Sequence, residues 1–254
     1  MLRGIAKKIG EIAKVSRGIG PAAAAFYYLQ GLRRNIFSLR RPYRVYAAGV
    51  RFPLWLRPRT TDVYVFEQIF VNKQFSCFDR WDGNGLVVDL GGYTGLSAAY
   101  FLNKFPRCRV AAVESDPENF ALLKKNLAPY GERVRAIQAA VWSHRTAVCL
   151  SEKQLKEGGE WAREVREAGP GETGTVETID IPAILKDSGT DRITILKMNI
   201  EGAEAVVFRD SGKWLPYVDA LIMHIHDNTP FGPCREMIAA ATRAAGFRMS
   251  VTGG

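Results

Sequence analysis

The chain has little cysteine and little histidine for its 254 residues. Its four cysteines are far apart and form no C-x-x-C pair: Cys77, Cys108, Cys149 and Cys234. This spacing excludes a disulfide scaffold and a structural zinc site, because both need paired or clustered cysteines. It indicates a reducing compartment, so we expect a cytoplasmic protein.

Long apolar runs, internal repeats and low-complexity tracts are also missing. The longest uncharged run, residues 18–32, is shorter than the roughly 20 residues that span a bilayer. It also makes a poor secretory signal, because it starts late and lacks a clear cleavage site. The length of the chain predicts one large core with at most a small appendage.

Acidic residues are nearly absent from the first 60 positions, which hold 13 Lys and Arg and one acid, Glu11. The remaining 194 residues hold 22 basic and 25 acidic side chains, so they do not form a basic nucleic-acid-binding body. Ile5, Ile9 and Ile12 follow helical spacing, and Pro21 lies near the start of a second predicted helix. Two interpretations of this basic helical segment, residues 1–45, stay open. It is a helix pair docked on the protein's own core, or an amphipathic element that makes the protein membrane-peripheral or contacts an acidic partner.

The rest of the chain predicts an α/β fold. Residues 46–84 predict a hairpin and then a helix capped by Thr61 or Asp62, and we expect this segment to cover a cofactor site. Residues 85–254 alternate strand, turn and helix, with "RVRAIQAAVW" as one strand and "FRMSVTGG" starting a last one. A polar, Gly-rich insertion near 151–175 is expected on the surface, part of it helical. The alternation predicts a mostly parallel sheet with helices on both faces.

The stretch "LVVDLGGYTGLSAAY" places a glycine turn directly after a buried strand. A dinucleotide turn needs G-x-G-x-x-G to hold a pyrophosphate, but Tyr93 stands where its second glycine would fall, and Asp89 would repel phosphate. An acid at the strand end suits the cationic amino-acid part of S-adenosylmethionine, and Glu114 after the next strand suits ribose hydroxyls. The pattern therefore favours a methyltransferase. A tight packing turn without any ligand stays open as the alternative.

Several motifs together resemble the FkbM-type methyltransferases over roughly residues 48–227. They are "DLGGYTGLSA", "VESDPENFALLKKNL", "IQAAVWS", "TIDIPAIL", "LKMNIEGAE" and "IMHIH", in the order and spacing of that family. The resemblance implies a Rossmann-like class I methyltransferase fold and the cofactor S-adenosylmethionine, with S-adenosylhomocysteine as product. It also implies methyl transfer to a hydroxyl of a sugar, glycan or polyketide-type metabolite.

Carried over by position, the resemblance also implies site residues. The cofactor residues would be Asp89, Gly91, Gly92, Tyr93 and Gly95 for the methionine part, Glu114 for the ribose, and Ser115, Gln138 and Ala140 beside the adenine. Asn199 would face the transfer region, although the family commonly has Asp there. An Asn excludes a general base or a strong metal ligand at this position.

Methylation of a hydroxyl needs a group that accepts its proton, and histidine suits that role near neutral pH. His144 is expected in a surface turn, whereas His224 and His226 are two apart on a strand and share one face near its carboxyl end. His226 is the first candidate for the base and His224 the second, with Glu201 orienting either one. A purely structural role of the histidine pair stays open, and Glu204 is expected to be a helix N-terminal acid.

Two further expectations complete the interpretation. Lys197 is a strand residue expected to reach the site edge or a neighbouring carboxylate. The H-x-H spacing resembles metal sites, but Asn199 removes the carboxylate partner, so we expect no metal dependence.

Two alternative functions stay open. One is a non-catalytic binding or scaffold protein that keeps the cofactor fold. The other is a methyltransferase acting on nitrogen or nucleic acid, of which nucleic acid is disfavoured.

Overall fold

A five-stranded parallel sheet forms the centre of the computed structural model, which describes residues 2–37, 41–154, 163–169, 171–227, 229 and 231–250. In spatial order its strands are β11 (Val218–Met223), β10 (Ile193–Met198), β3 (Leu86–Leu90), β4 (Arg109–Glu114) and β5 (Val134–Gln138). The chain moves outward from β3 in one direction and then returns to extend the sheet in the other. This doubly wound order is Rossmann-like, as predicted, and it leaves a topological switch point at the carboxyl ends of β3 and β10.

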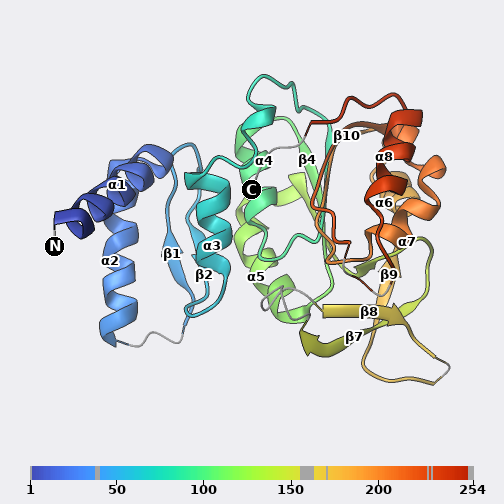
Figure 1. The fold of residues 1–254 in the computed structure, drawn as a ribbon, viewed down its shortest axis with the longest axis horizontal. Coiled ribbons are helices and arrows are strands. Elements are labelled where there is room, and N and C mark those ends of the chain that lie inside the picture. The colour runs from blue at the N-terminus through green and yellow to red at the C-terminus, as the bar shows by residue number, and fades with distance from the viewer. Residues whose placement is uncertain are drawn as a thin grey trace.

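Helices cover both faces of the sheet (Figure 1). On one face lie α4 (Leu96–Lys104) and α5 (Pro117–Leu127), whose apolar side chains share a core with Val87. The other face is covered by α6 (Ile181–Asp187), α7 (Glu204–Arg209) and α8 (Arg235–Ala244), which share a core with Val88. Successive strand residues thus point to opposite cores, which is why these strands are apolar throughout rather than alternating.

The N-terminal part of the chain packs beside the α4–α5 face (Figure 1). Its elements are α1 (Leu2–Ile19), α2 (Pro21–Phe37), β1 (Tyr43–Val45), β2 (Leu54–Leu56), α3 (Asp62–Phe66), the π-helix η1 (Glu67–Val71) and the 3₁₀ turn η2 (Ser76–Phe78). The hairpin is confirmed, since β1 and β2 pair antiparallel. Thr61 occupies the predicted N-cap position of α3 but makes no side-chain capping hydrogen bond, and Asp62 turns its carboxylate to Arg57.

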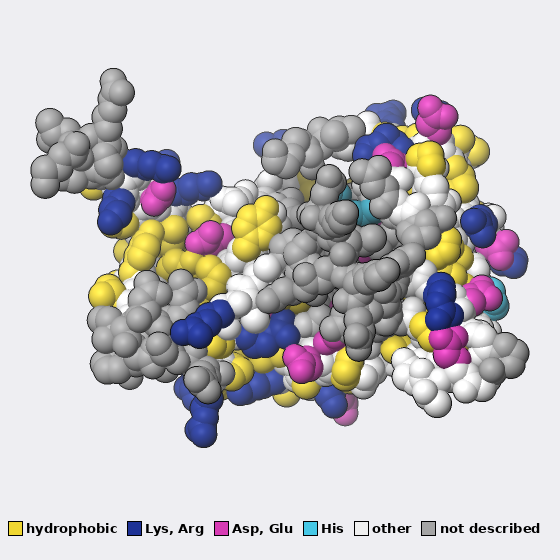
Figure 2. All heavy atoms as spheres, turned by 60° about the horizontal axis from the view of Figure 1, so that its bottom comes forward, with side chains coloured by type: hydrophobic (Ala, Val, Ile, Leu, Met, Phe, Trp, Pro, Cys, Tyr) yellow, Lys and Arg dark blue, Asp and Glu magenta, His cyan; other side chains and the backbone are white. Residues whose placement is uncertain are grey.

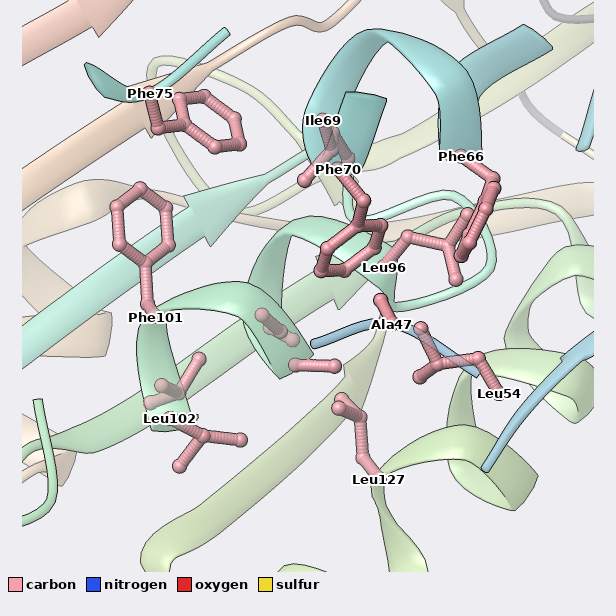
Figure 3. Close-up of a cluster of buried hydrophobic side chains, with 14 of the residues drawn as sticks. Ala47, Leu54, Phe66, Ile69, Phe70, Phe75, Leu96, Phe101, Leu102 and Leu127 are labelled. Atoms are coloured by element: carbon pink, nitrogen blue, oxygen red, sulfur yellow. The ribbon is translucent and has the colours of Figure 1, made fainter. Parts of the chain in front are cut away.

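Phenylalanine side chains join residues 46–84, called the covering segment below, to α4 (Figure 3). Phe66 and Phe70 point from α3 and η1 toward Leu96, and Phe75 lies 4.9 Å from Phe101 between ring centroids. The same core includes Ile19 at the end of α1. The covering segment and the helix pair α1–α2 are therefore fixed to the sheet by apolar burial, the main favourable term in folding.

A second, smaller sheet corrects one sequence prediction. Its order is β6 (Ala140–Val141), β9 (Thr175–Ile179), β7 (Ala147–Gln154) and β8 (Arg163–Glu167). The single strand predicted over "RVRAIQAAVW" is wrong, because the chain leaves the main sheet at Ala139 and β6 pairs with β9. The insertion contains a strand, β8, that was not predicted; residues 155–162 and 170 lie outside the described residues, so a helical part of the insertion stays a prediction.

The C-terminal part differs from prediction at one point. No strand forms over residues 247–250, where a last strand was predicted, and residues 251–254 lie outside the description. The remaining short helical turns are η3 (Ala128–Arg133), η5 (Ser211–Lys213) and η6 (Leu215–Tyr217). Among the helices that the structure describes, none is both long and apolar enough to cross a membrane.

Candidate active site at the carboxyl edge of the sheet

The glycine turn after β3 is shaped by close packing inside the protein. Gly91 has φ +71°, and a Cβ added there would lie 1.8 Å from the carbonyl oxygen of Asn199. A Cβ on Gly92 would lie 2.8 Å from the Leu123 side chain, and Gly95 precedes α4 with φ +80°. The glycines are thus required by the approach of β10 and α5, so their spacing alone does not identify a ligand.

A buried ion pair between Asp89 and Lys197 lies against this turn. The Asp89 carboxylate is fully buried and lies 2.9 Å from the Lys197 ammonium, and the Ser97 hydroxyl donates to it at 2.5 Å. Lys197 also donates to the Gly91 carbonyl at 2.7 Å, so the expectation that it reaches a neighbouring carboxylate is confirmed. Asp89 has its partners within the protein and acts on the turn through Lys197. Direct contact between Asp89 and a ligand stays a prediction.

Glu114 lies at the end of β4, beside the turn. Its two carboxylate oxygens accept the backbone N–H groups of Tyr93 at 2.8 Å and Asp116 at 2.9 Å. Burial raises the pKa of Glu114, while these two N–H groups act to lower it. The strand register places Gln138 directly opposite Glu114, with Gln138 exposed and Ser115 half-buried. Ala140 begins β6 nearby and is buried, so the predicted cofactor residues gather at one edge of the sheet.

Tyr93 connects the turn to the covering segment. Its hydroxyl donates to Asp62 at 2.7 Å and lies 2.9 Å from the Thr61 hydroxyl. Asp62 is fully buried and also accepts the backbone N–H and the guanidinium of Arg57. Burial and the Asp62 charge raise the pKa of Tyr93. The sequence analysis missed this cluster, because no local pattern links Asp62 to a tyrosine 31 positions away.

His226 lies between two glutamates just beyond the end of β11. Its Nδ1 is 2.9 Å from the Glu204 Oε1, and its Nε2 is 3.4 Å from the Glu201 Oε2. The prediction that both histidines lie on a strand is wrong, because β11 ends at Met223; the ring centroids of His224 and His226 are nevertheless 4.6 Å apart, so the two histidines share one side, as predicted. Glu204 is fully buried at the start of α7, and Glu201 adopts φ +51° in the turn before it.

Burial and charge together shift the pKa values of the groups in this cluster. Burial acts to lower the pKa of His226. The hydrogen bond to Glu204 and the charges of both glutamates act to raise it, and together they outweigh burial, so the pKa lies above its ordinary value. Burial raises the pKa of Glu201 to about 7, against the opposing charges of His226 and Lys197. His224 moves the other way, since burial and the neighbouring His226 lower its pKa. Groups that titrate near pH 7 inside a packed site suit proton transfer.

Asn199 and Glu204 complete the arrangement. The Asn199 backbone N–H donates to the Leu90 carbonyl at 3.0 Å, which places Asn199 against the glycine turn. Its side-chain oxygen is buried and has no hydrogen-bond partner among the described residues. Glu204 lies at a helix N-terminus as expected, but its contact with His226 was missed. The only sequence signal for it is a second acid three positions after Glu201.

A metal site would need several histidine, cysteine or acid side chains close together. Within the described ranges, no group of three or more His, Cys, Asp and Glu side chains is arranged to hold a metal ion. His144, the third histidine, is exposed in the turn between β6 and β7, where its ring lies beside Ser143 and Glu167.

Comparison with known proteins adds a family match. A family model described as "Methyltransferase FkbM domain" matches residues 89–249, more than half of the chain. The methyltransferase sdnD of Sordaria araneosa is 24% identical over 185 residues, which are 59% of this chain and 70% of that protein.

Two solved structures are also similar at low sequence identity. A methyltransferase FkbM from Methylobacillus flagellatus KT aligns with a TM-score of 0.46 and 15% identity, over 95% of this chain and 54% of that one. A precorrin-6y C5,15-methyltransferase from Geobacter metallireducens GS-15 aligns with a TM-score of 0.43 and 12% identity, over 72% and 73% of the two chains.

Proposed function

The chain belongs to the methyltransferase FkbM domain family, and from this premise we propose that it is an S-adenosylmethionine-dependent O-methyltransferase. Its acceptor would be a hydroxyl of a sugar, glycan or polyketide-type metabolite. The observation that carries the proposal is the position of His226 between Glu201 and Glu204. Glu201 and Glu204 come shortly after Asn199 in the chain, and the Asn199 carbonyl packs against Gly91 in the glycine turn.

The residues at the carboxyl edge fit the proposed cofactor chemically. Glu114 places a carboxylate at the end of β4, and the neighbouring Lys197 ammonium adds no free positive charge because it is paired with the buried Asp89. Such an edge suits a cationic ligand without phosphate. Two buried side-chain oxygens, on Thr94 and Asn199, have no protein partner among the described residues and leave hydrogen-bonding capacity for a polar ligand.

Each predicted residue has a role in this proposal. The backbone of Gly91 to Gly95 would hold the methionine part and Glu114 the ribose, while Ser115, Gln138 and Ala140 border the adenine. Asp89 would act indirectly, through Lys197 and the turn. When bound, S-adenosylmethionine supplies an electrophilic methyl group on a sulfonium.

His226 would accept the proton of the acceptor hydroxyl. The contact with Glu204 fixes a proton on Nδ1, which leaves Nε2 as the ring nitrogen with a free lone pair. The hydroxyl proton would pass to Nε2, and the oxygen would use the electron pair of the broken O–H bond for its new bond to the methyl carbon, while the carbon–sulfur bond would break with its electron pair left on sulfur. Glu201, 3.4 Å from Nε2, stabilises the imidazolium that results.

The decisive experiment combines cofactor binding with methyl transfer. Calorimetry measures binding of S-adenosylmethionine, and a labelled-methyl assay then screens sugars, glycans and polyketide alcohols. We expect His226→Ala to lower turnover by about 10²–10⁴-fold, the usual worth of a general base, with little change in cofactor affinity. His144→Ala is the matched control, because His144 is exposed and its ring contacts Ser143 and Glu167, not Glu201 or Glu204. Unchanged turnover in His226→Ala would contradict the assignment of the base.

A second candidate function rests on Asn199. Because an amide replaces the family's usual carboxylate, the chain also fits a protein that binds the cofactor without transferring its methyl group. Tight binding of S-adenosylmethionine with no transfer to hydroxyl, amine or nucleic-acid acceptors would favour this candidate. Transfer to amines or nucleic acid alone would instead overturn the hydroxyl assignment.

A further inference from the structure

Among the side chains of α1 that the structure describes, residues 7–19, the buried ones lie in its last turns. Val15 and Ile19 are buried, and Gly18 packs so closely that an added Cβ would lie 2.6 Å from the Val71 Cα. Residues 7–14 of the same helix are all exposed. More than two helical turns of α1 therefore project from the core, as Figure 1 shows at the end of the molecule marked N.

The helix pair α1–α2 carries exposed apolar side chains. Four large apolar residues of the helix pair are about half exposed or more: Ile9 (61%), Ile12 (48%), Leu29 (53%) and Leu32 (58%). Each helix contributes two, at a spacing of three positions that puts both on one side of the helix. Figure 2 shows hydrophobic side chains gathered on the end of the molecule made by these helices.

Basic side chains accompany this apolar surface. Lys7 and Lys14 stand two positions from Ile9 and Ile12, which is roughly 160° round a helix of 3.6 residues per turn. Lys8 borders the isoleucines, and Glu11 is the one acid in the first 60 positions, against 13 Lys and Arg. Figure 2 shows Lys and Arg at the border of the hydrophobic surface. The segment is thus amphipathic and strongly cationic.

We propose that α1 docks this protein on an anionic lipid surface, with Ile9 and Ile12 in the interface and the lysines at the headgroups. The charge calls for an anionic partner, and exposed isoleucine on a basic helix suits a lipid interface better than a nucleic acid. An acidic protein or RNA would be held by the cations alone. This inference concerns where the protein binds and does not depend on the proposed methyl acceptor.

The test is co-sedimentation of the full chain with vesicles. We expect binding to an equal mixture of phosphatidylcholine and phosphatidylglycerol at low salt, and little binding to phosphatidylcholine alone. The double variant Ile9→Asp with Ile12→Asp is expected to bind at least about tenfold less, because two apolar contacts are lost and two like charges are added. Lys7→Gln with Lys8→Gln is expected to weaken binding about fivefold per residue.

The matched control is Met237→Asp, which places a charge on an exposed apolar residue of α8 and leaves α1 intact. It is expected to bind as the unchanged chain does, and circular dichroism checks that every variant is folded. Three results would overturn the proposal. They are no binding to the mixed vesicles, binding that the isoleucine variant retains but heparin competes away, and a dimer that the isoleucine variant dissociates.

Discussion

Single residues of the His226 cluster set how the activity depends on pH. His226 must be neutral to accept a proton, and its pKa lies above its ordinary value because Glu204 and Glu201 stabilise the charged ring. Glu201 itself has a pKa of about 7. We therefore expect kcat/KM to rise with pH through the neutral range as the pair loses its proton.

Glu201→Gln tests the origin of this dependence. The substitution removes a negative charge 3.4 Å from Nε2, which lowers the pKa of His226. The rising limb of kcat/KM should therefore move to lower pH, as measured by initial rates across the range. A limb that stays in place would show that Glu201 and His226 do not titrate together.

Gly91 is the residue at which the backbone of the site is most constrained. Gly91→Ala adds a Cβ at positive φ and 1.8 Å from a backbone carbonyl, so β10 would have to move. We expect a loss of at least about 3 kcal/mol in the free energy of unfolding, since the cost of a left-handed alanine adds to that of overpacking. Gly189→Ala is the control: its φ is also positive, at +63°, but its Cβ would meet nothing within 4 Å, so only the left-handed cost of about 1–2 kcal/mol applies. Equal losses in urea denaturation would contradict the role of the close approach.

At the scale of elements, Asp62 joins the covering segment to the glycine turn. Its buried carboxylate holds both Arg57, next to β2, and the hydroxyl of Tyr93. Asp62→Ala leaves these groups without their acceptor, and breaking a buried charged pair typically costs about 3–5 kcal/mol.

The control for this prediction is an exposed ion pair. Asp79→Ala breaks the contact with Lys104 at the surface and should cost less than about 1 kcal/mol. Because Tyr93 also donates its backbone N–H to Glu114, we expect Asp62→Ala to weaken cofactor binding as well. Unchanged calorimetric affinity would separate the covering segment from the cofactor site.

At the scale of the whole molecule, one core runs from the N-terminal helices to the sheet. Ile19 is fully buried and belongs to the same cluster as Val87 in β3. We expect Ile19→Ala to lower the free energy of unfolding by about 2–5 kcal/mol, in a single transition. Ile9→Ala, on the same helix but exposed, should change it by less than about 0.5 kcal/mol.

Thermal unfolding followed by two probes checks this prediction. Tryptophan fluorescence reports on the chain after residue 45, where all five tryptophans lie, and far-ultraviolet circular dichroism reports on all helices. Coincident midpoints that shift together in Ile19→Ala are expected. A separate early transition would instead show that residues 1–45 unfold as an independent unit, which is the division that the sequence suggested.

Local patterns predicted most of the elements correctly. The apolar runs, Pro117 at the start of α5 and the Gly91–Gly95 turn are signals carried by neighbours in the chain. Their alternation was enough for a Rossmann-like sheet, and the motif order was enough for the family. The errors lie where tertiary pairing overrides local pattern: "RVRAIQAAVW" splits because β6 pairs with β9, and β8 forms because it pairs with β7.

The sequence by itself determined the order of strands and helices, the basic N-terminus and the glycine turn, because each is a property of adjacent residues. Only the tertiary structure decided which groups meet. Lys197 reaches Gly91 across 106 positions, Tyr93 reaches Asp62 across 31, and Glu204 reaches His226 across 22. The contacts of Lys197 and Glu204 arise because parallel strands bring their carboxyl ends to one edge, whatever their separation in the chain, whereas Tyr93 meets Asp62 because α3 packs against the glycine turn. The physical reason is that periodicity reports one element at a time, whereas a site is assembled from several.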